Sequence, residues 1–139
     1  MSHLKYFNYP GFGEHANKET HYCQSVRIDN RVEISGQGGW DRTTHAIHPD
    51  LAAEVDQAFS NVQHALEHAG SKGWPQVYSV RVYTCAGTTG STILDVGAEV
   101  VRNLRKWCTE HEPLLTVVHV AGLYDENMRI EMEVAAHLG

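Results

Sequence analysis

The pattern that most constrains the fold is a long amphipathic helix predicted for residues 51–69. Its apolar side chains recur at helical spacing, at Leu51, Val55, Ala58, Phe59, Val62, Ala65, Leu66 and Ala69. This spacing gathers them into one stripe, which has to be buried against another element. Asp50 is suited to cap the start of the helix, and Gly70 is suited to end it.

Strand patterns surround this helix. Apolar and polar residues alternate on both sides of Asp29-Asn30, a pair that favours a tight hairpin turn because both residues tolerate positive φ. Further strands are predicted for 76–85, 115–123 and 128–138, with a second amphipathic helix over 96–108 and a Gly- and Thr-rich loop over 86–92. We expect residues 1–20, broken by Pro10-Gly11, to form an irregular lead-in.

The element order β-β-α-β-α-β-β predicts an α+β fold in one domain spanning 1–139, a mixed sheet with both helices on one face. Side chains of a strand alternate between the two faces, so the apolar residues of the central strands cannot all point towards the helices. These residues are Tyr78, Val80, Val82, Val117, Val118 and Val120. An apolar sheet face without a helix to cover it predicts an oligomer.

Charge and composition narrow the possible partners. The chain of 139 residues has a net charge of −6, which disfavours nucleic acid, and its densest basic cluster (Arg102, Arg105, Lys106) fits a solvated helix face. No apolar run is long enough for a membrane span. The N-terminus resembles neither a signal nor a transit peptide, so we expect a cytoplasmic protein without membrane contact. The three cysteines fit no metal or disulfide spacing.

Metal and nucleophilic sites are not supported by the motifs. His64 and His68 have the i, i+4 spacing of metal ligands but lie on the polar face of the helix, and Ala65 stands where an HExxH motif needs glutamate. Ser35 lacks the flanking glycines of a nucleophile elbow. We therefore predict neither a metal nor a cofactor.

Two features are compatible with either a functional or a structural role. Glu131 and Glu133 share one face of the last strand, where partial burial would raise the pKa of a glutamate towards that of a useful acid or base; the alternative is a paired or rim-exposed carboxylate. Gly38-Gly39 either leaves backbone amides open to a ligand or forms a structural turn.

Two longer signatures carry a resemblance to a known family. Ile34-Ser35-Gly36-Gln37-Gly38-Gly39 and Ile130-Glu131-Met132-Glu133-Val134-Ala135, together with a long helix ending in Ala69-Gly70, resemble the RidA/YjgF family, also called L-PSP-like. The resemblance covers residues 22–138. It implies a homotrimer with a chorismate-mutase-like fold, three clefts between neighbouring subunits, and hydrolysis (deamination) of reactive imines and enamines.

The same resemblance assigns roles to single residues. Glu131 matches the glutamate that orients the attacking water, and Tyr22 matches an aromatic hydroxyl on the other side of the cleft. We expect Trp40 to lie over the cleft mouth and make it more apolar. The predicted ligand-binding residues are Tyr22, Ser35, Gly36, Gln37, Gly38, Trp40, Leu115 and Val117.

One family position differs in a way that affects the reaction. Leu115 occupies the place of the arginine that holds the substrate carboxylate, and Val101 lies near the place of a family asparagine. Losing such a charge-assisted anchor costs about 1.5–3 kcal/mol. Either another cation, with Arg81 and Arg129 as candidates, replaces it, or the ligand has no carboxylate there. A small-molecule binder with altered deaminase specificity is favoured; the alternatives are a non-catalytic binding or protein-protecting module and an endoribonuclease.

Overall fold

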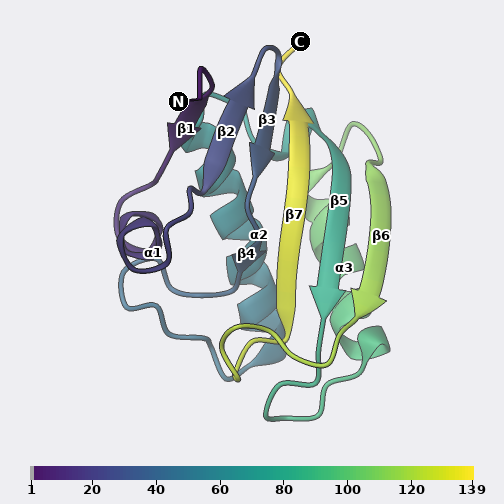
Figure 1. Ribbon diagram of the computed structural model, residues 1–139. Helices are drawn as coiled ribbons and strands as arrows, with labels where there is room; N and C mark the ends of the chain where they lie inside the picture. Colours follow the sequence, from purple (N-terminus) through teal and green to yellow (C-terminus); the bar gives the residue numbers. More distant parts are fainter. Residues whose placement is uncertain (1) are drawn as a thin grey trace.

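A single mixed sheet organises the chain in the computed structural model, which describes residues 2–139 (Figure 1). Its strands run in the order β1-β2-β3-β7-β5-β6, and the short β4 also pairs with β7. Only β5 and β6 pair in parallel. The strands are β1 (Lys5–Phe7), β2 (Ser25–Ile28), β3 (Arg31–Ile34), β4 (Gln37–Gly38), β5 (Val77–Thr84), β6 (Leu114–His119) and β7 (Ile130–His137).

The two predicted helices lie behind the sheet, on one face, as α2 (Leu51–His68) and α3 (Ile93–Trp107) (Figure 1). The Asp50 side chain accepts a hydrogen bond from Ala53 N (3.0 Å), as expected for a helix cap. α3 begins three residues before the predicted start because Thr92 and Asp95 form a capping box. The α+β prediction is thus confirmed, with two helices on one sheet face.

The N-terminal prediction was wrong. Residues 2–20 are not irregular: they contain β1 and a third helix, α1 (Phe12–Thr20), which lies beside the β1–β2 edge, apart from the two long helices (Figure 1). Pro10-Gly11 precedes this helix rather than breaking structure. Gly11 has φ +77°, and the N–H of Phe12 donates to Arg42 O (2.9 Å). A contact with a residue 30 positions away is not visible in a local pattern.

β7 divides the molecule into two faces. Ile130, Met132, Val134 and Ala136 are buried against the helices, whereas Glu131 and Glu133 point to the opposite face and are half-buried. Beneath the sheet, Phe59 of α2 stacks on Trp74 with ring centroids 4.7 Å apart. The predicted strand alternation is therefore confirmed, and it separates an apolar core from a face that carries carboxylates.

None of the helices in residues 2–139 combines the length and the apolar character needed to cross a bilayer.

Candidate active site

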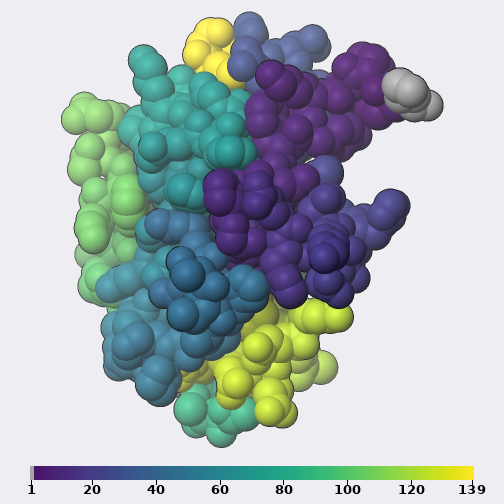
Figure 2. Space-filling model, turned by 90° about the vertical axis from the view of Figure 1, so that its left-hand side faces the viewer, coloured from purple at the N-terminus to yellow at the C-terminus, as the bar shows by residue number. Residues whose placement is uncertain are grey.

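A pocket of about 520 Å³ lies where α1, the chain around residues 40–47, the segment before β7 and β7 itself meet. The first three of these segments adjoin one another on the side of the molecule shown in Figure 2, where they are coloured purple, blue and yellow. Residues far apart in sequence form its wall, among them Phe12, His15, Tyr22, Trp40, Tyr124 and Glu131. Two of the sequence-predicted site residues from opposite ends of the chain, Tyr22 and Glu131, thus lie in one cavity with Trp40.

Glu131 is the carboxyl group at the sheet side of this pocket. Burial, helped by repulsion from Glu133, raises the pKa of Glu131 above its ordinary value. None of the ion pairs within residues 2–139 involves Glu131, whereas Glu133 accepts a hydrogen bond from the Tyr83 hydroxyl. Glu131 is therefore a half-buried carboxyl group beside a cavity, and no cation of residues 2–139 pairs with it.

Close approach of the Glu131 side chain explains why residue 36, in the loop before β4, is a glycine. A Cβ added there would lie 2.5 Å from Glu131 Oε1 and 2.8 Å from its Cδ. Any side chain at residue 36 would displace the Glu131 carboxyl group. Gly36 therefore fixes the position of Glu131 by close packing.

Tyr22 lies at the mouth of the pocket, with 36% of its surface exposed. Burial of the phenol raises the pKa of Tyr22, and the negative charge of Glu131 acts in the same direction. The hydroxyl therefore stays protonated at neutral pH and is available as a hydrogen-bond donor.

Trp40 forms a buried wall of the pocket rather than a cover over its mouth, because it is only 4% exposed. Its ring stacks on Phe12 of α1 with centroids 3.8 Å apart and planes 17° apart. The Trp40 Nε1–H donates to the Tyr9 hydroxyl (3.2 Å), which donates to Gln37 Oε1 (2.8 Å). Helix α1, which was not predicted from the sequence, thus contributes Phe12 to an aromatic pair in the pocket wall.

Gln37 and Ser35 do not reach the pocket with their side chains. Gln37 is fully buried, and its Nε2 donates to Gln24 Oε1 (2.8 Å) and to Ser35 O (3.1 Å). The Ser35 hydroxyl donates to Cys23 O (2.7 Å). These polar groups hold the chain next to Glu131 in place, so their predicted direct contact with a ligand is replaced by a supporting role.

Gly38-Gly39 does not expose its amides to a ligand; close packing explains both glycines. A Cβ on Gly38 would lie 2.5 Å from Met128 Cε, and one on Gly39 would lie 2.2 Å from Glu54 O. Both residues are buried, and Asn61 of α2 donates to the Gly38 carbonyl (2.8 Å). The structural alternative is therefore the one that holds.

Leu115 and Val117 lie on the other face of the sheet from Glu131. In the parallel pairing of β5 and β6 they stand beside Val80 and Val82, which are buried under the helices. Leu115 is 41% exposed, and Val117 packs against the core. A single chain therefore does not bring Leu115 and Glu131 together; only a second copy can place them in one cleft.

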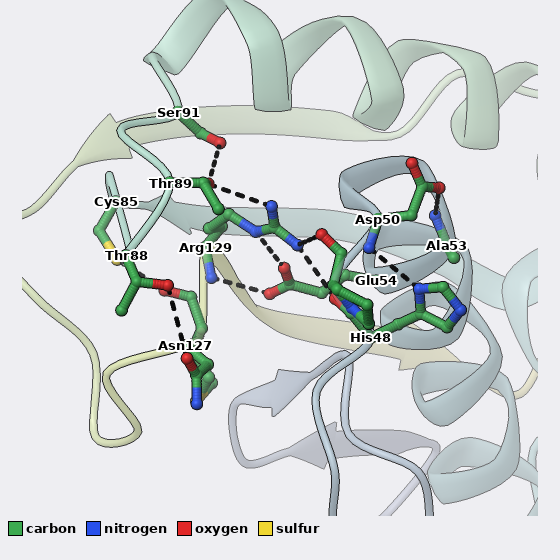
Figure 3. A network of polar contacts seen from close by, with 12 residues as sticks. His48, Asp50, Ala53, Glu54, Cys85, Thr88, Thr89, Ser91, Asn127 and Arg129 are labelled. Atoms are coloured by element: carbon green, nitrogen blue, oxygen red, sulfur yellow. Dashed lines mark hydrogen bonds and ion pairs between the residues drawn. The ribbon is translucent and has the colours of Figure 1, made fainter.

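Arg129, one of the two candidates predicted to replace the family arginine, is not a free cation. Its Nε donates to Glu54 Oε1 (2.6 Å), its main-chain N–H to Glu54 Oε2 (2.8 Å), and its remaining nitrogens to Thr89 and the carbonyls of His48 and Pro49 (Figure 3). Burial raises the pKa of Glu54, and the hydrogen bonds and the positive charge of Arg129 act in the opposite direction. Arg81 is exposed beside Glu133 in the β5–β7 pairing and is not among the residues that line the pocket.

The histidine predictions are corrected in part. His64 is half-buried rather than solvated, with its ring edge-on to Tyr9 at 5.1 Å. His15 and His45, which sequence reasoning did not select, line the pocket, and their ring centroids are 4.8 Å apart. Within residues 2–139 there is no group of three or more potential ligand side chains that could hold a metal ion.

Comparison with known proteins identifies the family. A model of the family described as endoribonuclease L-PSP matches residues 13–138. The chain belongs to the RidA/YjgF (L-PSP) family. It is 29% identical over 113 residues, 81% of either chain, to a protein of Dermatophagoides farinae named 2-iminobutanoate/2-iminopropanoate deaminase.

Solved structures of this family share the fold. The crystal structure of RidA from an Antarctic Psychrobacter superposes with a TM-score of 0.74 at 26% identity, covering 86% of this chain and 89% of the other. Yeast Mmf1 gives a TM-score of 0.78 at 20% identity, covering 98% and 99%. The RidA/YjgF fold therefore extends over almost the whole chain, including the N-terminal region.

Proposed function

We propose that this RidA/YjgF protein is a cytoplasmic homotrimer that hydrolyses reactive imines or enamines in clefts between its subunits. Its substrate specificity is altered from that of the deaminases of the family. The observation that carries the proposal is the Glu131 carboxyl group, which lies half-buried beside a cavity of about 520 Å³ and forms no ion pair within the part of the chain that the structure describes. The relatedness to a protein named as an imine deaminase supports the same reaction class.

The chemistry assigned to the pocket is water activation. Glu131 acts as the general base that takes a proton from water as the oxygen attacks the imine carbon, a role for which a raised pKa is suited because proton transfer is most effective near the working pH. Tyr22, protonated at neutral pH, donates a hydrogen bond to the developing amine or hydroxyl group. The glycine amides at residues 38 and 39 are buried, so this donor role falls to Tyr22.

A neighbouring subunit supplies the second wall of the cleft in this proposal. Leu115 and Val117 lie on the opposite sheet face from Glu131, and Val101 of α3 is 42% exposed one residue from Arg102, which pairs with Asp56 of α2. Asn103 bonds the same Asp56, and at about 100° per residue Arg102 and Asn103 lie about 100° and about 200° from Val101, so Val101 faces away from α2. The positions of the family arginine and asparagine are therefore both apolar, and the trimer cleft binds its substrate without that carboxylate anchor.

The charge of the pocket favours the deaminase hypothesis over the ribonuclease hypothesis. Carboxyl groups line the cavity, and no Lys or Arg is found among the lining residues of the described chain. RNA binding depends on positive charge along the phosphate backbone.

The test is a coupled deamination assay with enzymatically generated imines from several amino acids. We expect weak activity of the wild type on alanine-derived imine, a gain with Leu115→Arg, and loss by a factor of about 10²–10⁴ with Glu131→Gln, as for removal of a general base. Leu94→Arg is the matched control, since Leu94 is an 80% exposed leucine of α3 that does not line the pocket.

Three results would contradict the proposal. Robust wild-type activity on alanine-derived imine would show that another residue holds the carboxylate. An active Glu131→Gln variant would remove Glu131 from the reaction. A monomeric mass in light scattering after gel filtration would remove the composite cleft.

A further inference from the structure

The charge of the pocket selects against the carboxylate-bearing imines that amino acids yield. Glu19, Asp125 and Glu131 line it, and no lysine or arginine is among the lining residues in 2–139. The two arginines of neighbouring segments are engaged elsewhere: Arg42 donates to Ser60 and Asn61, and Arg129 is held by Glu54. A substrate carboxylate here would meet three carboxyl groups and no lysine or arginine to pair with, whereas a cation would be attracted.

The walls of the pocket favour an aromatic group. Phe12 and Trp40 form a stacked pair, and His45 stands edge-on to Phe12 with ring centroids 5.3 Å apart. Tyr22 and the highly exposed Tyr124 lie at the open side. Aromatic faces bind both aromatic rings, by stacking, and organic cations, by their negative π face.

The size of the pocket points to a substrate larger than the smallest imines. Its volume of about 520 Å³ is within the range of small-molecule sites. A three- or four-carbon imine would leave much of this space unfilled, while a substituent with one aromatic ring would occupy it. Leu115 itself adds an apolar side chain to the cleft in the proposed trimer, in place of a cation.

We propose that the substrates are arylalkyl iminium ions without a carboxylate, of the kind formed by oxidation of primary arylalkylamines. This inference rests on the proposed function. The reaction is R–CH=NH₂⁺ + H₂O → R–CHO + NH₄⁺ and involves no oxidation or reduction. Water oxygen bonds to the imine carbon while the C=N π electrons move to nitrogen, and Glu131 takes the water proton. Glu131 then returns a proton to nitrogen, the C–N bond breaks, and the hydroxyl proton leaves with ammonia as ammonium.

Binding of unreactive probes tests this selectivity without requiring catalysis. 2-Phenylethylammonium and 3-phenylpropanoate have the same ring and nearly the same length but opposite charge. By calorimetry on the intact protein, we expect the cation to bind about tenfold more tightly than the anion, a difference typical of one changed charge contact in a partly buried site. Equal or tighter binding of the anion, or no binding of either probe at millimolar concentration, would overturn the inference.

Two glutamates of α1 provide a matched pair of variants. Glu19 lines the pocket and Glu14, also exposed on the same helix, does not. Glu19→Gln is expected to weaken cation binding by about two- to fivefold, as for an exposed ion pair, with Glu14→Gln unchanged. Equal losses in both variants would show that the overall charge of the molecule selects the cation, and this too would overturn the inference.

Hydrolysis separates this inference from the proposed function. Imines are generated from 2-phenylethylamine by an amine oxidase and from phenylalanine by an amino-acid oxidase; they differ in the carboxylate. We expect kcat/KM to be higher for the amine-derived imine by about tenfold. Faster hydrolysis of the phenylalanine-derived imine would leave the proposed function standing and overturn the substrate class. Selective cation binding with no hydrolysis of either imine would support the ligand class and overturn the catalytic role.

Discussion

Two glutamates on opposite sides of the sheet, one buried and one half-buried, show how the same side chain serves structure in one region and chemistry in another. Glu54 is fully buried in α2 and accepts two hydrogen bonds from Arg129, which also binds the carbonyls of His48 and Pro49. Glu131, two residues after Arg129, is only half-buried, faces a cavity and has no ion-pair partner among residues 2–139. The difference lies in the partner: one carboxylate is neutralised by the fold, and the other is left for a ligand.

The largest effect is expected from breaking the buried pair. Arg129→Met leaves Glu54 buried without its cation and should cost about 3–5 kcal/mol of the free energy of unfolding. Urea denaturation at pH 7 measures this loss. Arg102→Met is the control, because Arg102 pairs with Asp56 while both side chains are nearly half exposed (46% and 47%), and such a pair contributes about 0–1 kcal/mol.

A double variant sharpens the same point. Glu54→Leu combined with Arg129→Met removes both charges and should recover part of the stability that the single Arg129→Met variant loses. If Arg129→Met were as stable as the double variant, the loss of stability would not come from an unpaired charge on Glu54.

A smaller effect, confined to activity, is expected at Gly36. Gly36→Ala puts a Cβ where the Glu131 carboxyl group lies, and because that group is the end of a flexible side chain it can move aside without unfolding the protein. We expect kcat/KM on the best imine substrate to fall by about ten- to a hundredfold, as for a misplaced catalytic group. Gly122→Ala, where nothing lies within 4 Å, should be neutral. Full activity of a folded Gly36→Ala protein would mean that the Glu131 position is not critical.

The smallest effect concerns pH and stability. The pKa of Glu131 is raised on folding, so the folded state binds more protons than the unfolded state between the two pKa values, and this group makes stability fall as pH rises. Glu131→Gln should therefore raise Tm slightly at pH 7, and the gain should shrink as the pH is lowered towards 4. Thermal unfolding across this range provides the check.

Asp41 provides the opposite sign. Hydrogen bonds from the backbone N–H groups of Thr44 and Thr43 lower the pKa of Asp41, so its contribution is present at neutral pH and is lost on acidification. Asp41→Asn should thus lower Tm at pH 7, with a difference that vanishes at low pH. If Glu131→Gln and Asp41→Asn changed Tm with the same sign at pH 7, the raised pKa that burial gives Glu131 would be contradicted.

Much of the fold could be predicted because it depends on periodicity. The stripe of α2 and the alternation of β7 are local patterns, and alternation alone predicted that Glu131 and Glu133 share one face of the sheet. The hairpin at Asp29-Asn30 was likewise predictable from its turn residues, and Asp29 has φ +50°.

Only the tertiary structure decided which charged groups are free and what surrounds them. Arg81 and Arg129 were equivalent candidates in the sequence, but the partner of Arg129 lies 75 residues away in α2. The helix α1 depends on a turn at Gly11 that packs against Arg42, and through Phe12 it supplies the aromatic wall beside Trp40. Periodicity in the sequence indicates the direction in which a side chain points relative to its own helix or strand. The burial, pairing and cavity that give Glu131 its chemistry are set by contacts between elements, which no local pattern encodes.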